Sequence, residues 1–109
     1  MNTTREHLAN FQIAGLTYYD APLCFKNLKV GTKLRLELEK DNKFDARAVA
    51  IYYKDHKLGF VPKSENRIFY KLLLMGYYSI FDLVIQQVDS SEHPENQVRV
   101  VAHLRHCEE

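Results

Sequence analysis

The sequence predicts a mainly β protein in which six short strands and one clear helix form a small barrel. Apolar and polar side chains alternate strictly from Lys33 to Glu39, and this period of two is typical of a half-buried strand. Further along the chain the period changes to that of a helix, and turn-forming residues separate the segments. A barrel is favoured because closure removes the edges that a small sheet would otherwise expose.

The first four strands are expected at residues 11–19, 33–39, 48–53 and 57–61. The polar tip Lys54-Asp55-His56 is suited to a hairpin between the third and fourth strands. A helix is then expected over residues 64–75, because Ser64 can cap a first turn after Pro62 and Gly76 is placed as a stop. Its apolar residues fall on one side at helical spacing: Ile68, Phe69, Leu72, Leu73 and Met75. Closing strands are expected at residues 80–88 and 98–104, around a polar, exposed loop at residues 89–96.

Length and composition indicate a single domain. The chain has 109 residues, of which 46% are hydrophobic and 27% charged, as in ordinary globular proteins. We expect an N-terminal tail at residues 1–10, a domain at 11–105 and a C-terminal tail at 106–109. No apolar run approaches the roughly 18 residues that a membrane span needs, and the first ten residues lack the apolar stretch of a secretory signal. These features favour a cytoplasmic protein that has no membrane partner and keeps Cys24 and Cys107 as reduced thiols.

Charge is unevenly distributed although the net charge is only +1. Residues 26–63 contain ten Lys or Arg against five Asp or Glu, whereas residues 64–109 contain four against seven. The basic half suggests a face suited to a polyanion. Lysines on solvated strand faces would give the same asymmetry.

Activated groups of the kind that catalysis requires are not seen in the sequence. None of its four serines lies in a glycine-flanked elbow, Cys24 has apolar neighbours that favour an inert buried thiol, and the histidines are scattered. We therefore expect no enzyme activity, no cofactor and no metal. A metal-dependent nuclease that uses Asp41 and Asp45, which share one loop, is an alternative.

Three places carry residues suited to binding. Tyr18 and Tyr19 are adjacent, so on a strand one would pack inward and the other would offer a stacking surface, unless both pack at the core rim. Asn42 and Asp45 are turn formers, and their polar atoms bond either the local backbone or a nucleotide. Lys63 precedes the expected helix and could hold a phosphate there or simply be solvated.

The segments at residues 14–19, 41–50 and 57–66 together resemble the HIRAN domain in their order and spacing, over about residues 11–104. That family includes modules on SWI/SNF-type DNA translocases and small standalone bacterial proteins. The resemblance implies an OB-like barrel with added helices and a non-catalytic module that binds single-stranded DNA at free 3′ ends. It also implies a DNA repair, replication-fork or mobile-element setting, and a protein partner that supplies a motor or enzyme activity.

The resemblance also implies where DNA binds. The family's paired aromatics match Tyr18 and Tyr19, its end-pocket aspartate matches Asp45, and its DNA-contacting lysine matches Lys63. A terminal 3′-hydroxyl is a donor, so an aspartate acceptor is chemically consistent. The expected nucleic-acid site consists of Tyr18, Tyr19, Asn42, Asp45 and Lys63, with Phe60 on the aromatic wall and Lys43 and Arg47 on the rim.

Four positions depart from the DNA-end-binding members of the family. Those members carry Arg where this chain has Thr17, Asn where it has Asp41, Tyr where it has Phe44 and His where it has Phe60. Each change removes a donor or adds negative charge, and one lost Arg–phosphate contact costs about 1.5–3 kcal/mol. The sequence leaves open whether end binding is kept, altered or lost, and whether the ligand is DNA or RNA. A peptide-binding module on the same barrel is the alternative function.

Overall fold

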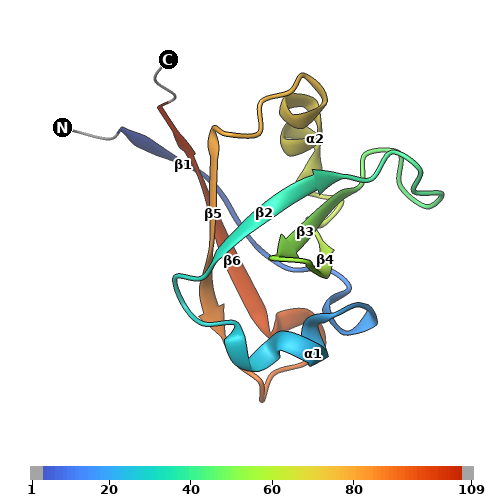
Figure 1. Ribbon diagram of the computed structural model, residues 1–109, viewed down its shortest axis with the longest axis vertical. Coiled ribbons are helices and arrows are strands. Elements are labelled where there is room, and N and C mark those ends of the chain that lie inside the picture. Colours follow the sequence, from blue (N-terminus) through green and yellow to red (C-terminus); the bar gives the residue numbers. More distant parts are fainter. Residues whose placement is uncertain (1–3, 107–109) are drawn as a thin grey trace.

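A computed structural model describes residues 4–106 and shows six antiparallel strands in one sheet. The prediction of a mainly β fold with six strands is confirmed. The sheet order is β1-β6-β5-β2-β3-β4, and Figure 1 shows three long strands crossed by β2, with the β3–β4 hairpin beyond it. The strands are β1 (Arg5–Gln12), β2 (Lys33–Leu38), β3 (Val49–Tyr53), β4 (His56–Phe60), β5 (Phe81–Val88) and β6 (Val98–Arg105); the α-helices are α1 (Ala21–Cys24) and α2 (Asn66–Leu74); the 3₁₀ helices are η1 (Leu16–Tyr18), η2 (Phe25–Asn27) and η3 (Pro94–Asn96).

The hydrogen-bonded sheet is not closed, which corrects the expectation of a complete barrel. Its end strands β1 and β4 do not pair; instead, the chain after β1 touches β4 through an isolated bridge between Ala14 and Phe60. The two residues exchange backbone hydrogen bonds, each 2.9 Å long. Gly59 permits this approach, since a Cβ atom there would lie 2.3 Å from the carbonyl oxygen of Ala14. One bridge at a glycine thus joins the sheet ends where a full ladder was expected.

The first strand lies earlier in the chain than the sequence predicted. β1 begins at Arg5, inside the expected N-terminal tail, and ends at Gln12. The expected strand at residues 11–19 is wrong after that point because Gly15, at φ 72°, turns the chain into η1. Tyr18 and Tyr19 therefore lie on a tight turn and not on alternate faces of a strand. Helix α1 and η2 follow at once and were not predicted.

Helix α2 is shorter than the expected segment at residues 64–75. It begins at Asn66, and Ser64 lies in the preceding turn without capping the helix. Gly76 ends it as expected, with φ 89° and an N–H that donates to Leu73 O at 2.9 Å. The expected apolar face is partly wrong: Phe69 and Leu73 are buried, whereas Met75 is 72% exposed. Ile68 is also exposed.

The core lies between the two halves of the sheet and α2. Phe69 of α2 packs its ring against Phe11 of β1 at 5.8 Å and Phe81 of β5 at 5.4 Å between centroids. The other strands predicted from sequence agree closely with β2, β3, β4, β5 and β6. In residues 4–106, no helix combines the length and apolar character needed to cross a membrane.

Candidate nucleic-acid interface

A pocket of about 260 Å³ opens where the bridge, the β2–β3 loop and the end of β4 meet. The β2–β3 loop, residues 39–48, projects from the body of the molecule (Figure 1). Five of the residues predicted from sequence line this pocket together: Tyr19, Asn42, Asp45, Phe60 and Lys63. The remaining lining residues are Ala14, Gly15, Phe44, Ala48 and Val61.

Two aromatic rings of the pocket lining pack together, and Lys57, which is not itself a lining residue, contacts both of them. Tyr19 meets Phe60 edge to face, with 5.6 Å between ring centroids. The Lys57 ammonium lies 4.5 Å from the centroid of each ring, within the range of a cation–π interaction. The same ammonium pairs with the carboxylate of Glu39 at 2.5 Å.

Sequence reasoning missed Lys57 because strict alternation places it and Phe60 on opposite faces of a strand. The register of β4 against β3 shifts at this point: Ile51 pairs with Gly59, but Tyr52 pairs with Lys57. Leu58 is therefore the extra residue of a β-bulge, which resets the alternation. The bulge brings Lys57 and Phe60 to the same face, and the isolated glycine Gly59 within the strand is a sequence signal for such a bulge.

The β2–β3 loop is held by the side chain of Asn42. Its Oδ1 accepts from the backbone N–H groups of Phe44 at 2.8 Å and Asp45 at 2.9 Å. Its Nδ2 donates to Glu39 Oε1 at 3.0 Å, and Glu39 in turn pairs with Lys57. Asn42 thus takes the local turn role that was weighed for it, and it couples the loop to the aromatic wall.

Asp45 is anchored through both carboxylate oxygens. Oδ1 accepts from Arg47 N at 2.9 Å, and Oδ2 accepts from Asn66 Nδ2 at 2.9 Å. Asn66, the first residue of α2, is only 1% exposed, and its Nδ2 also donates to Arg47 O at 2.9 Å. Each carboxylate oxygen can still accept another donor. Asp45 therefore has a fixed orientation at the pocket and spare acceptor capacity.

Lys63 lies in the turn before α2, three residues ahead of the helix and not directly at its start. Its exposed ammonium donates to Phe44 O at 3.3 Å, and both residues line the pocket. The first helical residue, Asn66, bonds the Asp45 carboxylate, so an acidic group already stands near this helix end. Lys63 is therefore a pocket residue that does not adjoin the helix end, in contrast to what the sequence suggested.

Other predicted site residues lie outside the pocket lining. Tyr18 is 84% exposed on η1, whereas Tyr19 is 38% exposed and packs against Phe60. Lys43 and Arg47 are exposed on the β2–β3 loop next to lining residues, which is a rim position. Phe44 lines the pocket, although its ring is largely exposed.

The acidic residues do not gather in a way that would hold a metal. Among residues 4–106 there is no group of three or more His, Cys, Asp or Glu side chains suited to a metal ion. Asp45 is engaged with Arg47 and Asn66, and Asp41 is exposed. The nuclease alternative gains no support from this arrangement.

Aromatic rings close to lysines are the combination with which nucleic-acid-binding modules hold single strands, and Tyr19, Phe60 and Lys63 combine them in this pocket. The chain belongs to the HIRAN family, because the HIRAN domain model matches residues 7–105. A HIRAN domain is generally a DNA-binding module. The fold is similar to that of a Lactobacillus plantarum protein solved by structural genomics, with a TM-score of 0.79, 18% identity, and coverage of 97% of this chain and 100% of that one. A search of curated proteins found no match.

Proposed function

We propose that this protein is a non-catalytic module that binds single-stranded DNA and takes the free 3′-terminal nucleotide into the pocket. The observation that carries the proposal is that Tyr19 and Phe60, whose rings Lys57 contacts, line the same pocket as the anchored carboxylate of Asp45. A base stacks on an aromatic ring whatever its sequence, and a nearby ammonium neutralises its phosphate. The pocket therefore offers a partner for each part of a nucleotide.

Each group in the pocket has a distinct role in this proposal. The terminal base stacks on the Tyr19–Phe60 wall, where it replaces solvent on the exposed part of Tyr19. Lys63 meets the phosphate that precedes the terminal nucleotide, in exchange for its single bond to Phe44 O. Asp45 accepts a hydrogen bond from the 3′-hydroxyl. Each of its oxygens can accept one more hydrogen bond besides the one from Arg47 N or from Asn66 Nδ2.

The residues that depart from the end-binding pattern change which contacts contribute most to DNA binding. Phe60 cannot hydrogen-bond, but it builds the aromatic wall and holds Lys57 over its ring. Thr17 and Asp41 are exposed and lie outside the pocket lining. Because residue 17 is Thr and not Arg, the Arg–phosphate contact of the end-binding members is missing. Binding then depends more on stacking and on Lys57 and Lys63, and we expect micromolar rather than nanomolar affinity.

The setting of this activity is part of the proposal. We place the protein in the cytoplasm, in DNA repair, replication-fork processing or mobile-element biology, with a partner protein that supplies the motor or enzyme activity. The buried free thiol of Cys24 is consistent with a reducing compartment. No cofactor is proposed.

Fluorescence anisotropy with a 5′-labelled single strand of ten nucleotides tests the proposal. Strands ending in a 3′-hydroxyl and in a 3′-phosphate are compared at two salt concentrations, together with the same sequence as RNA. Salt-sensitive binding that the 3′-phosphate abolishes supports end recognition, because the added charge meets Asp45. Equal binding of both ends would reject the end pocket, and no binding at low salt would reject the DNA proposal. Salt-insensitive binding of an unstructured peptide in this pocket would favour the peptide alternative.

A further inference from the structure

Strands β2 and β5 separate soon after they pair. Their register holds only at Lys33 with Val84 and Leu34 with Leu83. Beyond Leu34, β2 continues to Leu38 and pairs with β3 alone in the described residues. A second pocket, of about 350 Å³, lies in the opening between β2, β5 and the end of α2. It shares no lining residue with the pocket proposed for DNA.

The opening leaves a free backbone edge on β2. Glu39 N donates to Ala48 O on the β3 side, so alternation turns the N–H and C=O groups of Glu37 and Arg35 toward β3 as well. Those of Leu34 and Leu36 face β5, but the β5 register ends at Leu34. The backbone groups of Leu36 therefore face the pocket with no strand opposite them, which is a template for pairing with an added strand.

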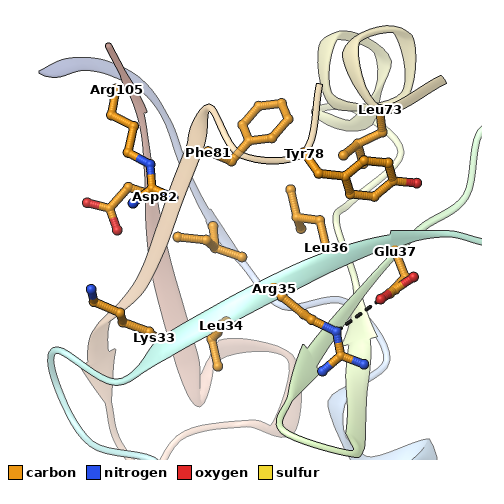
Figure 2. Close-up of a pocket in the computed structure, with 11 residues that line it drawn as sticks. Lys33, Leu34, Arg35, Leu36, Glu37, Leu73, Tyr78, Phe81, Asp82 and Arg105 are labelled. Carbon is orange, nitrogen blue, oxygen red and sulfur yellow. Dashed lines mark hydrogen bonds and ion pairs between the residues drawn. The ribbon is translucent and has the colours of Figure 1, made fainter. Parts of the chain in front are cut away.

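The pocket beside this edge has an apolar floor. Figure 2 shows Leu36, Leu73, Tyr78 and Phe81 gathered around the space between β2 and the end of α2. Tyr78 is 47% exposed, whereas Leu36, Leu73 and Phe81 are buried. An apolar side chain entering from solvent would cover the exposed face of Tyr78 above these buried side chains.

The rim of the pocket is more basic than acidic. Lys33, Arg35 and Arg105 line it together with Glu37 and Asp82. Asp82 is already paired with Arg5 at 2.7 Å, and Glu37 with Arg35 at 3.0 Å, so the acidic groups are neutralised. Lys33 is exposed on β2 and has no salt-bridge partner among the described residues. Within residues 4–106, the unpaired charge at this rim is therefore positive and comes from Lys33 and Arg105.

We propose that this opening is a second binding site, which takes an extended peptide segment of a partner protein as an added strand along β2. The segment carries one apolar side chain for the floor and acidic residues on either side of it for Lys33 and Arg105. Its backbone bonds the N–H and C=O of Leu36, and it lengthens the short β2–β5 ladder. Because the two pockets share no residue, DNA and peptide are held at the same time.

The probes that test this are fluorescein-labelled hexapeptides in which Asp or Glu alternates with Leu, Val or Phe. Binding is followed by anisotropy, and its place by the ¹⁵N–¹H shift of the Leu36 amide, with peptide up to about 1 mM. We expect the Leu36 amide to shift and its hydrogen exchange to slow. Versions N-methylated at alternate residues, and versions with Lys in place of the acids, are expected to bind at least ten-fold more weakly.

Two pairs of variants separate the site from general surface effects. Tyr78→Ala is expected to weaken peptide binding on the order of ten-fold, whereas Tyr77→Ala, also exposed but outside the lining, leaves it unchanged. Lys33→Glu weakens binding about three- to ten-fold, and Lys29→Glu is its matched control. None of these variants alters binding of the single strand, so failure here is distinct from failure of the DNA proposal.

Several results would overturn the proposal. They are an unmoved Leu36 amide with every peptide of the set, equal affinity of the N-methylated versions, and loss of the peptide when DNA saturates the other pocket. Sedimentation of the protein alone tests whether a second copy of the chain, and not a peptide, occupies the site. A concentration-dependent dimer that Lys33→Glu or Tyr78→Ala dissociates would assign the edge to a second copy of the chain instead.

Discussion

Asn66 donates its side-chain amide to Asp45 Oδ2 at 2.9 Å, and this bond joins the first turn of α2 to the β2–β3 loop. A second bond from the same nitrogen reaches Arg47 O at 2.9 Å. One buried amide thereby fixes the loop that supplies Asn42, Phe44, Asp45 and Ala48 to the pocket lining. The geometry of the pocket thus depends on a residue that does not line it.

Replacing Asn66 with Ala should destabilise the fold. The change removes the donor of Asp45 Oδ2 and Arg47 O from two part-buried hydrogen bonds and empties a buried position, which costs about 1–3 kcal/mol in the free energy of unfolding. Urea denaturation followed by circular dichroism measures it, with the exposed Asn96→Ala as the control. Equal unfolding midpoints for the two variants would refute the anchoring role.

Removing the ring of Tyr19 should weaken binding of a single strand. Stacking contributes about 1–3 kcal/mol per base, so Tyr19→Ala is expected to raise Kd roughly 5- to 150-fold, whereas Tyr19→Phe keeps most of the affinity. Anisotropy titration measures the change, and Tyr77→Ala serves as an exposed tyrosine far from the pocket lining. A Kd for Tyr19→Ala that matches the Tyr77→Ala value would exclude the stacking wall.

Neutralising Lys57 should reduce the salt dependence of binding. One lost phosphate contact lowers the slope of log K against log[salt] by about 0.7 for a single strand, so Lys57→Gln is expected to bind more weakly with a flatter slope. The exposed Lys26→Gln is the control. If affinity falls but the slope is unchanged, Lys57 only supports the Tyr19 and Phe60 rings and does not meet a phosphate.

Gly59 should be far less tolerant of a methyl group than Gly31. Both have positive φ, but a Cβ at Gly59 would lie 2.3 Å from Ala14 O, whereas nothing lies within 4 Å at Gly31. Gly31→Ala is expected to cost about 1–2 kcal/mol from backbone strain alone, and Gly59→Ala about 1–3 kcal/mol more. Thermal unfolding of the two variants compares them; equal losses would mean that the Ala14–Phe60 bridge contributes little.

The thiol of Cys24 should lower stability at alkaline pH. Burial, with a smaller contribution from Asp20, raises the pKa of this thiol, so the fold favours its protonated form. That stabilisation is present below the unfolded-state pKa of about 8.5 and is lost as pH rises through the folded-state pKa. In a Cys107→Ser background, the Tm from pH 7 to 10 should fall more with Cys24 present than in Cys24→Ala. Parallel Tm curves would contradict this.

Local patterns predicted the regular strands well. The strict alternation of Leu34 and Leu36 located β2, and Gly76 located the end of α2, because both depend on neighbours in sequence. The first strand was misplaced because Gly15 turns the chain within an apolar stretch. The prediction of a closed sheet was wrong because the two ends of the sheet meet only in one long-range bridge, between Ala14 and Phe60.

The sequence named several of the residues that line the candidate pocket. Tyr19, Asp45 and Lys63, to which the family resemblance assigns DNA binding, line this pocket together. Sequence reasoning missed Lys57 because the bulge at Leu58 changes its face. It also missed Asn66, whose function depends on burial against a loop 21 residues away in sequence. Both omissions come from tertiary contacts that residue spacing does not encode.

The most direct test of the central claim is a ¹⁵N–¹H titration of the protein with an unlabelled single strand that ends in a 3′-hydroxyl. We expect the amides of Gly15, Tyr19, Asp45 and Lys63 to shift together, while the Leu36 amide at the second pocket does not move. Shifts confined to the β2–β5 opening, or spread over the surface without the pocket, would contradict it.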